Sequence, residues 1–132
     1  MLRLMSELDE LSIVQDQIGV PTSTASLAHV ITAIVHDSYF QAGIFHWADE
    51  GEISWYEFAV EIQRPGLELG LLSKEIPLRP IPSSQYPQAA RRPRYSVLDS
   101  SKLLKLTKLK RTPWQENLRL MLMAQLSFPS GT

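Results

Sequence analysis

Cysteine is absent from the 132 residues of this sequence, and long apolar runs are absent as well. Without thiols the chain cannot form a disulfide framework or a thiolate zinc site. No stretch approaches the length of about 20 apolar residues that a membrane-spanning helix needs. The first residues also lack the apolar centre and the cleavage site of a signal peptide. We therefore expect a cytoplasmic protein without a membrane partner.

The sequence signals of redox catalysis are missing too. No Gly-x-x-Gly-x-x-Gly pattern occurs, so no helix N-terminus is prepared for a dinucleotide pyrophosphate. None of the four tyrosines is followed four residues later by lysine, because those positions hold Gly43, Val60, Ala90 and Asp99. Without a Tyr–Lys pair there is no evident acid to protonate an alkoxide during hydride transfer. The sequence thus predicts neither catalytic nor cofactor-binding residues in this chain.

Metal ligands are sparse. His29 and His36 are seven residues apart and can share a helix face, but zinc needs at least a third ligand and Asp37 is the only neighbour of a suitable type. The acidic cluster at residues 49–52 lacks the spacing of a calcium loop and more simply favours the N-terminus of the helix that follows it. We therefore expect no metal site.

Charge is distributed unevenly, although the formal net charge is only −1. Residues 1–90 hold 4 Lys and Arg against 12 Asp and Glu, whereas residues 91–132 hold 9 against 2. Such asymmetry indicates either an anion-binding face or a match between the two halves, and a compact domain favours the match. No aromatic residues alternate with Lys102, Lys105 and Lys108, so we predict no nucleic-acid partner.

Apolar periodicity and capping signals predict an α/β chain in which helices and short strands alternate. Hydrophobic residues make up 44% of the chain and charged residues 20%, which is ordinary for one globular domain. We expect this domain over residues 1–126 and a flexible tail at 127–132. Helices are expected at residues 1–8, 22–35, 54–71, 100–104 and 112–126. Strands are expected at residues 11–14, 43–48, 76–82 and 95–98.

Two details of the expected helices matter for the site. Ser54 and Glu57 have the spacing of a capping box at the start of a helix. Pro65 should break or kink that helix, because proline removes a ladder hydrogen bond and clashes with the preceding turn, at about 3 kcal/mol or more. Trp47, Trp55 and Trp114 are expected to be core or packing residues, as large aromatic residues usually are.

Four sequence blocks, in order, carry a family resemblance. They resemble the C-terminal part of the dTDP-4-dehydrorhamnose reductases, which belong to the extended short-chain dehydrogenases, and the resemblance covers residues 1–126. The blocks are LSIVQDQIGVPT at 11–22, GIFH at 43–46 with SWYEFA at 54–59, YP at 86–87 leading into ARRP at 90–93, and YSVLD at 95–99 with KL at 102–103.

The resemblance implies a small, helix-rich substrate-binding portion that lacks the N-terminal Rossmann domain. The intact family reduces dTDP-4-dehydro-L-rhamnose to dTDP-L-rhamnose with NADPH or NADH, and its Rossmann domain supplies the cofactor site and the catalytic Tyr and Lys. By this resemblance the chain binds a dTDP-sugar, is inactive alone and has the missing Rossmann domain as its partner. Strands that would join the missing sheet should expose apolar surface, so we also predict self-association as a homo-oligomer.

Four residues are candidates for substrate binding. Gln17 lies in the Asp-Gln-x-Gly-x-Pro-Thr block, which the resemblance places near the substrate cleft, and its amide can bond a sugar or a base. A turn residue that satisfies local backbone is the equally supported alternative. Arg91, Arg92 and Arg94 have guanidinium groups that suit a pyrophosphate, with Arg92 the first choice. Their alternative is a surface cluster that pairs with the acidic half.

A second class of function stays open: a non-catalytic regulatory or binding module derived from the reductase fold. Reductase-like chains also serve as regulatory subunits, as in the accessory subunit of methionine adenosyltransferase. Co-purification with a partner protein, without affinity for any nucleotide sugar, would favour this interpretation.

Overall fold

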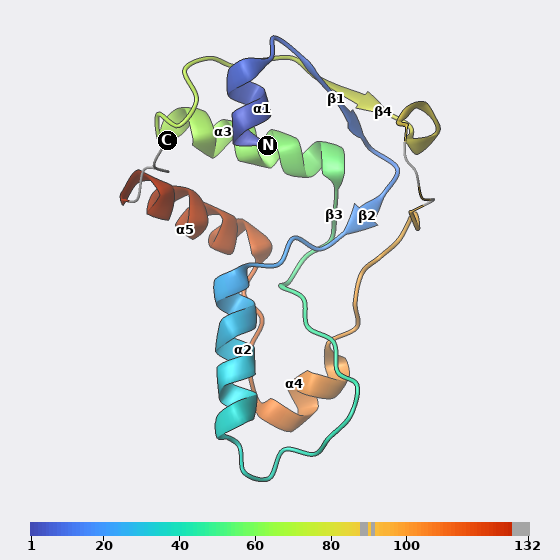
Figure 1. Cartoon of the computed structure of the whole chain (residues 1–132), viewed down its shortest axis with the longest axis vertical. Coiled ribbons are helices and arrows are strands. Elements are labelled where there is room, and N and C mark those ends of the chain that lie inside the picture. Colours follow the sequence, from blue (N-terminus) through green and yellow to red (C-terminus); the bar gives the residue numbers. More distant parts are fainter. Residues whose placement is uncertain (88–89, 91, 128–132) are drawn as a thin grey trace.

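The computed structural model describes residues 1–87, 90 and 92–127. Short strands and helices alternate along the chain, as expected for the α/β class (Figure 1). The helices are α1 (Leu2–Glu7), α2 (Thr24–His36), α3 (Trp55–Glu68), α4 (Ser101–Thr107) and α5 (Trp114–Ser127). The strands are β1 (Leu11–Val14), β2 (Ile18–Gly19), β3 (Ile53–Ser54) and β4 (Leu78–Ile81), and one 3-10 turn follows as η1 (Ser83–Gln85).

Two small sheets organise the chain. Strand β1 pairs in parallel with β4, and β2 pairs antiparallel with β3. A parallel pair needs a long crossover, and here the crossover contains α2, β3 and α3. Helix α3 packs against both β1 and β4. The predicted strands at 11–14 and 76–82 are thereby confirmed.

One hydrophobic core joins α1, β1, α3 and α5. Apolar side chains at helical spacing on α3 and α5 face each other, which is the burial that stabilises helices of this length. The buried members are Met5, Ile13, Ala59, Ile62, Leu72, Ile76, Trp114, Leu118 and Leu122. The predicted core position of Trp114 is confirmed, because this side chain is almost fully buried.

Helix α3 begins with the predicted capping box. Ser54 Oγ accepts the Glu57 N–H at 3.1 Å, and Glu57 Oε2 accepts the Ser54 N–H at 3.1 Å. Of the break or kink expected at Pro65, the break is wrong, because α3 continues through it to Glu68. Pro65 lies in the last turn, so it removes only one ladder bond, and burial of Ile62 on the core face holds the helix together.

The strand expected at residues 43–48 is wrong as well. Those residues form part of a loop between α2 and β3, and Ile44 is 79% exposed. Contacts to α4 replace strand pairing: Lys102 Nζ donates to the Ile44 carbonyl at 3.0 Å and lies 4.4 Å from the Phe45 ring centroid. A short apolar run does not by itself distinguish a strand from a loop that packs on a helix.

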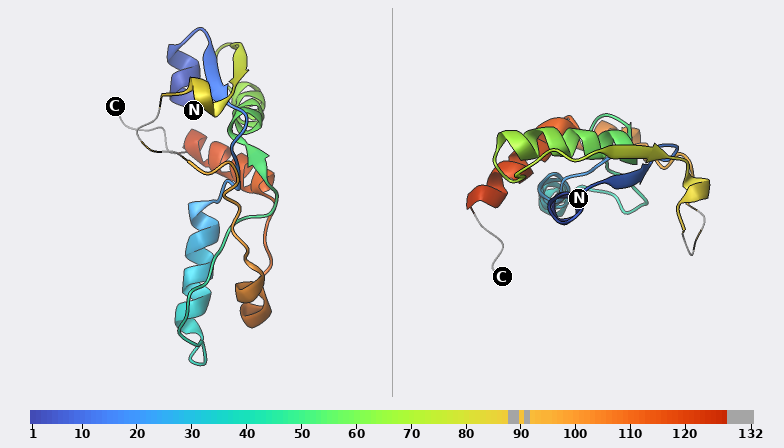
Figure 2. Two further views of the ribbon diagram at one scale, coloured as in Figure 1. Left: turned by 90° about the vertical axis from the view of Figure 1, so that its right-hand side faces the viewer. Right: turned by 90° about the horizontal axis from the view of Figure 1, so that it is seen from above.

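Helices α2 and α4 and the loop between α2 and β3 form an arm that projects from the core helices (Figures 1 and 2). On α2 the apolar side chains Leu27, Ile31 and Val35 are exposed. They provide apolar surface of the kind that favours association, and self-association itself stays a prediction.

The C-terminal boundary differs slightly from the expected one. Helix α5 includes Ser127, the first residue of the expected tail. Residues 128–132 lie outside the described residues. Within the described ranges, no helix combines the length and hydropathy that crossing a membrane would need.

Candidate functional site

Strand β2 lies between two neighbours at the centre of the candidate site. On one side it pairs with β3, with Ile18 opposite Ser54. On the other side the Ile18 N–H donates to the Arg94 carbonyl at 2.7 Å, and the Ser96 N–H donates to the Ile18 carbonyl at 2.9 Å. The strand expected at 95–98 is thus a single bridge between Ile18 and Tyr95.

Side chains alternate between the two faces of this small ladder. Ile18, Ser54 and Tyr95 are paired and share one face, on which the Tyr95 hydroxyl donates to Glu52 at 2.6 Å. The opposite face, called the ladder face below, therefore carries the residues one position away. These are Gln17, Gly19, Ile53, Arg94 and Ser96.

A polar hollow of about 460 Å³ opens at the Gln17 end of the ladder face. It contains three of the four predicted substrate-binding residues, and the fourth, Arg91, lies outside the described residues. Sequence reasoning missed its hydroxyl groups, which come from η1 and the segment after it. The lining residues are Gln17, Ser83, Ser84, Tyr86, Ala90, Arg92, Pro93 and Arg94.

Gln17 is 7% exposed although it borders the polar hollow. Its side-chain amide forms no hydrogen bond with the described part of the chain, and no fully buried side-chain N or O atom there lacks a partner. The amide lies at the border of the hollow and can both donate and accept hydrogen bonds.

Arg92 and Arg94 are exposed on the wall of the hollow. The ion pairs among the described residues join Arg64 to Glu61, Lys74 to Asp9 and Arg79 to Glu10, and all of them lie within residues 1–90. The match expected between an acidic and a basic half is therefore not formed by ion pairs in this part of the chain.

Asp16 fixes the other wall of the polar hollow. Its carboxylate accepts the Ser83 N–H at 2.7 Å and the Ser83 hydroxyl at 2.9 Å, which anchors η1. Burial raises the pKa of Asp16, but the hydrogen bonds from Ser83 and the nearby charge of Arg94 together hold that pKa below its ordinary value. The carboxylate consequently stays ionised near neutral pH and keeps η1 beside Arg94.

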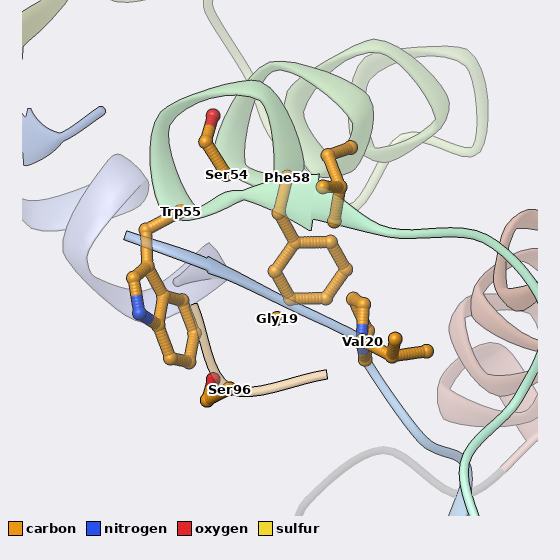
Figure 3. A pocket seen from close by; sticks show the side chains of 8 residues that line it. Gly19, Val20, Ser54, Trp55, Phe58 and Ser96 are labelled. Atoms are coloured by element: carbon orange, nitrogen blue, oxygen red, sulfur yellow. The ribbon is translucent and has the colours of Figure 1, made fainter. Parts of the chain in front are cut away.

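A second, apolar hollow of about 180 Å³ opens at the Gly19 end of the ladder face (Figure 3). Trp55 and Phe58 extend into this region from α3, with ring centroids 6.4 Å apart. Trp55 is 51% exposed, so it is a packing residue against Phe58 and not a core residue. It lies four residues before the buried Ala59, on the same face of α3, but at the first position of the helix, where it lines the hollow. The lining residues are Gly19, Val20, Pro21, Ile53, Ser54, Trp55, Phe58 and Ser96.

Asp49 holds the loop that follows β2. The side chain is fully buried and accepts the Ser23 N–H at 2.9 Å, the Ser26 hydroxyl at 2.6 Å and the Asn117 amide at 2.7 Å. It therefore joins the start of α2 to α5. For Asp49 the expected role at the N-terminus of α3 is wrong, since its carboxylate serves the N-terminus of α2.

Metal chemistry finds no support in the described ranges, where no three His, Asp or Glu side chains converge as a set of metal ligands. What the site offers instead is hydrogen bonding, positive charge and aromatic surface. The site has the character of a ligand-binding domain with a positively charged end and an aromatic end.

Comparison with known proteins identifies the family. The model described as RmlD substrate binding domain matches residues 1–127, and the chain belongs to this family. A dTDP-4-dehydrorhamnose reductase of Sinorhizobium fredii is 34% identical over 131 residues, covering 96% of this chain and 44% of the relative. The Escherichia coli K12 protein of that name is 33% identical over 130 residues, covering 92% of the chain and 42% of the relative.

Solved structures agree with this assignment. A dTDP-4-dehydrorhamnose reductase from Clostridium acetobutylicum superposes with a TM-score of 0.80 at 35% identity, covering 96% of this chain and 42% of that one. One from Bacillus anthracis, in complex with NADP, gives 0.79 at 30% identity, covering 93% and 40%. The chain thus corresponds to the C-terminal, substrate-binding portion and spans less than half the length of these relatives.

Proposed function

We propose that this chain binds a dTDP-sugar through the polar hollow, as the substrate-binding part of a dTDP-4-dehydrorhamnose reductase. The observation that carries the proposal is the convergence of the Gln17 amide with Arg92 and Arg94 on one hollow. Guanidinium groups match the paired oxygens of a pyrophosphate. A buried amide, which has both a donor and an acceptor, suits a sugar hydroxyl or a base.

Reduction of dTDP-4-dehydro-L-rhamnose with NADPH or NADH belongs, in this proposal, to the whole enzyme. The chain has no Tyr–Lys pair and no Gly-rich phosphate turn. It therefore has no residues that fit a dinucleotide, and we expect no turnover by the chain alone. The Rossmann domain would hold the cofactor, bring the catalytic acid and close over the sugar end of the ligand.

The free edge of β1 is the proposed contact for that Rossmann domain. Toward β4, Leu11 and Gln15 donate their N–H groups. By alternation, Ser12 and Val14 direct their N–H and C=O groups to the opposite edge. Parallel sheets of two strands rarely stand alone, so a further strand is expected at this open edge.

The outer edge of β4 supports the same choice. In the register of the pair, Pro80 directs its backbone nitrogen away from β1, and proline has no N–H to donate. The outer edge of β4 therefore lacks an N–H donor at Pro80, whereas the outer edge of β1 keeps its N–H groups. The partner domain has one suitable strand to extend, and this is β1.

Binding of dTDP-L-rhamnose to the isolated chain, measured by calorimetry, tests the proposed ligand. Arg92→Ala and Arg94→Ala should each weaken binding by about tenfold, because each removes a charge-assisted hydrogen bond. The control Arg64→Ala removes an arginine that pairs with Glu61 on α3 and should leave affinity unchanged. Equal affinities in all variants, or no binding at all, would contradict the proposal. Capture of a partner protein without nucleotide-sugar binding would instead favour a regulatory module.

A further inference from the structure

We infer that Asp16 is a positioning residue of the polar hollow, because its side chain holds the segments of the wall in the arrangement that a ligand meets. The inference rests on the proposed function, since it concerns the hollow to which the sugar nucleotide is assigned. Most of the wall comes from three segments, namely Gln17, the stretch around η1 and the stretch from Arg92 to Arg94. Each of them is joined to Asp16 or to the two residues that follow it.

Asp16 lies where β1 and β4 separate. A backbone hydrogen bond from the Gln15 N–H to the Ile81 carbonyl, at 3.0 Å, follows the paired residues of the two strands. The next bond between these segments comes from a side chain, because the Asp16 carboxylate accepts the Ser83 N–H at 2.7 Å. The carboxylate takes the place of the backbone carbonyl that a longer strand would offer. The chain after Gln15 can therefore leave the sheet without releasing η1.

The hold on η1 depends on Ser83. Pro82 has no N–H, so Ser83 supplies the first backbone donor after Ile81. The Ser83 hydroxyl donates to the same Asp16 carboxylate at 2.9 Å, so two hydrogen bonds fix one residue. The turn η1 begins at Ser83, and Ser84 beside it lines the hollow. A displacement of Ser83 would therefore displace this wall.

The two residues that follow Asp16 connect it to the rest of the wall. Gln17 is next in the chain, and its buried side chain borders the hollow. Ile18 then donates its N–H to the Arg94 carbonyl at 2.7 Å, which joins the arginine segment to β2. Only a few backbone dihedral angles thus separate the anchor of η1 from the anchor of Arg94. Holding Asp16 in place sets the distance between the two walls.

Binding of dTDP-L-rhamnose to the full chain, measured by calorimetry, tests the inference. Asp16→Ala leaves every lining residue in place but releases Ser83, and it should weaken binding by about tenfold. Asp16→Asn keeps the shape of the side chain. Its amide oxygen can accept the Ser83 N–H, and its NH₂ group can donate to the Ser83 hydroxyl. This variant should restore most of the affinity, to within about threefold of the unaltered chain.

A double-mutant cycle separates this role from a general loss of stability. Ser83→Ala should weaken binding less than Asp16→Ala, because the backbone N–H remains to be accepted. Added to Asp16→Ala, it should weaken binding no further, since both changes remove the same contact. Asp9→Ala is the matched control and should leave affinity unchanged, because Asp9 pairs with Lys74 and lies outside the lining of the hollow.

Spectra of ¹H–¹⁵N pairs without ligand report the positions of the segments directly. Asp16→Ala should shift the amide signals of Gln17, Ser84 and Arg94, while those of α5 stay unchanged. Equal affinity of Asp16→Ala and the unaltered chain, or an Asp16→Asn variant as weak as Asp16→Ala, would overturn the inference and leave the proposed function standing. Failure of the unaltered chain to bind dTDP-L-rhamnose would overturn both.

Discussion

Asp49 is a buried carboxylate with three donors around it, two at the start of α2 and one on α5. An asparagine at this position keeps the shape but exchanges one acceptor oxygen for a donor. At least one of the three donors is then left buried without an acceptor.

We therefore predict that Asp49→Asn lowers the free energy of unfolding by about 1–3 kcal/mol. Urea denaturation followed by circular dichroism measures the change. Glu50→Gln is the matched control, because its exposed side chain has no such set of donors, and it should shift stability little. A stability loss of the same size in both variants would contradict the role given to Asp49.

The carboxyl group of Glu57 leads to a prediction of how the stability of the chain depends on pH. The hydrogen bonds from the Ser54 hydroxyl and from the Ser54 backbone lower the pKa of this carboxyl below 4.5, against a smaller opposing effect of burial. A lowered carboxyl pKa stabilises the fold at pH values above the unfolded pKa, and this stabilisation is lost as pH falls through the folded pKa. The melting temperature should accordingly decrease as the pH is lowered below about 4.5.

Glu57→Gln isolates that contribution. The variant should melt at a lower temperature than the unaltered chain at pH 7, and the difference should shrink toward pH 3. Thermal unfolding at a series of pH values measures both. A difference that stays constant over this range would mean that the capping box acts through shape alone.

At the scale of whole elements, Pro65 within α3 makes the sharpest prediction. Pro65→Ala should restore the missing ladder hydrogen bond and stabilise the chain by about 1–3 kcal/mol. Chemical denaturation measures the gain, with Arg64→Ala as the neighbouring control. If instead Pro65→Ala were destabilising, the ring itself would be contributing packing that outweighs the lost bond.

Local signals predicted the elements that depend on local physics. The capping box at Ser54 and the helix that follows it depend on residues a few positions apart, and both were predicted correctly from the sequence. The segment at residues 43–48 was not, because its apolar residues contact α4, far along the chain. Whether such a run becomes a strand depends on the distant segment of the chain against which it packs, and the local sequence does not show which segment that is.

The site was only partly predictable for the same reason. Gln17 and the arginines became candidates through a family resemblance, and their convergence with η1 depends on Asp16 bonding to Ser83. Trp55 was expected to be a core or packing residue, as large aromatic residues usually are. Its place four residues before Ala59, on the buried face of α3, favours that expectation. The sequence does not show that the core ends before it reaches the first position of this helix.

At the scale of the molecule, the contact proposed at the open edge of β1 gives a prediction about association. Ser12→Pro removes an N–H that points away from β4, so it should leave the β1–β4 ladder intact while blocking a new strand. Ile13→Pro removes an N–H within the ladder and should destabilise the fold. The Rossmann domain of the Sinorhizobium fredii relative, produced separately, is the partner to mix with each variant.

We predict that the unaltered chain binds that domain, that Ser12→Pro does not, and that Ser12→Pro retains the melting temperature of the unaltered chain. Sedimentation velocity measures complex formation and also reports any self-association of the chain alone. Equal complex formation by Ser12→Pro and the unaltered chain would exclude the β1 edge as the contact.

The place of the ladder face in the chain has one more consequence. Gln17 follows Val14, the last residue of β1, by three positions, an extended reach of about 10 Å. A domain paired with β1 would therefore lie close to the ligand at Gln17. The ligand would then contact both that domain and this chain. Ligand and partner should then raise each other's affinity for this chain, so that binding of a nucleotide sugar strengthens the association of the two polypeptides.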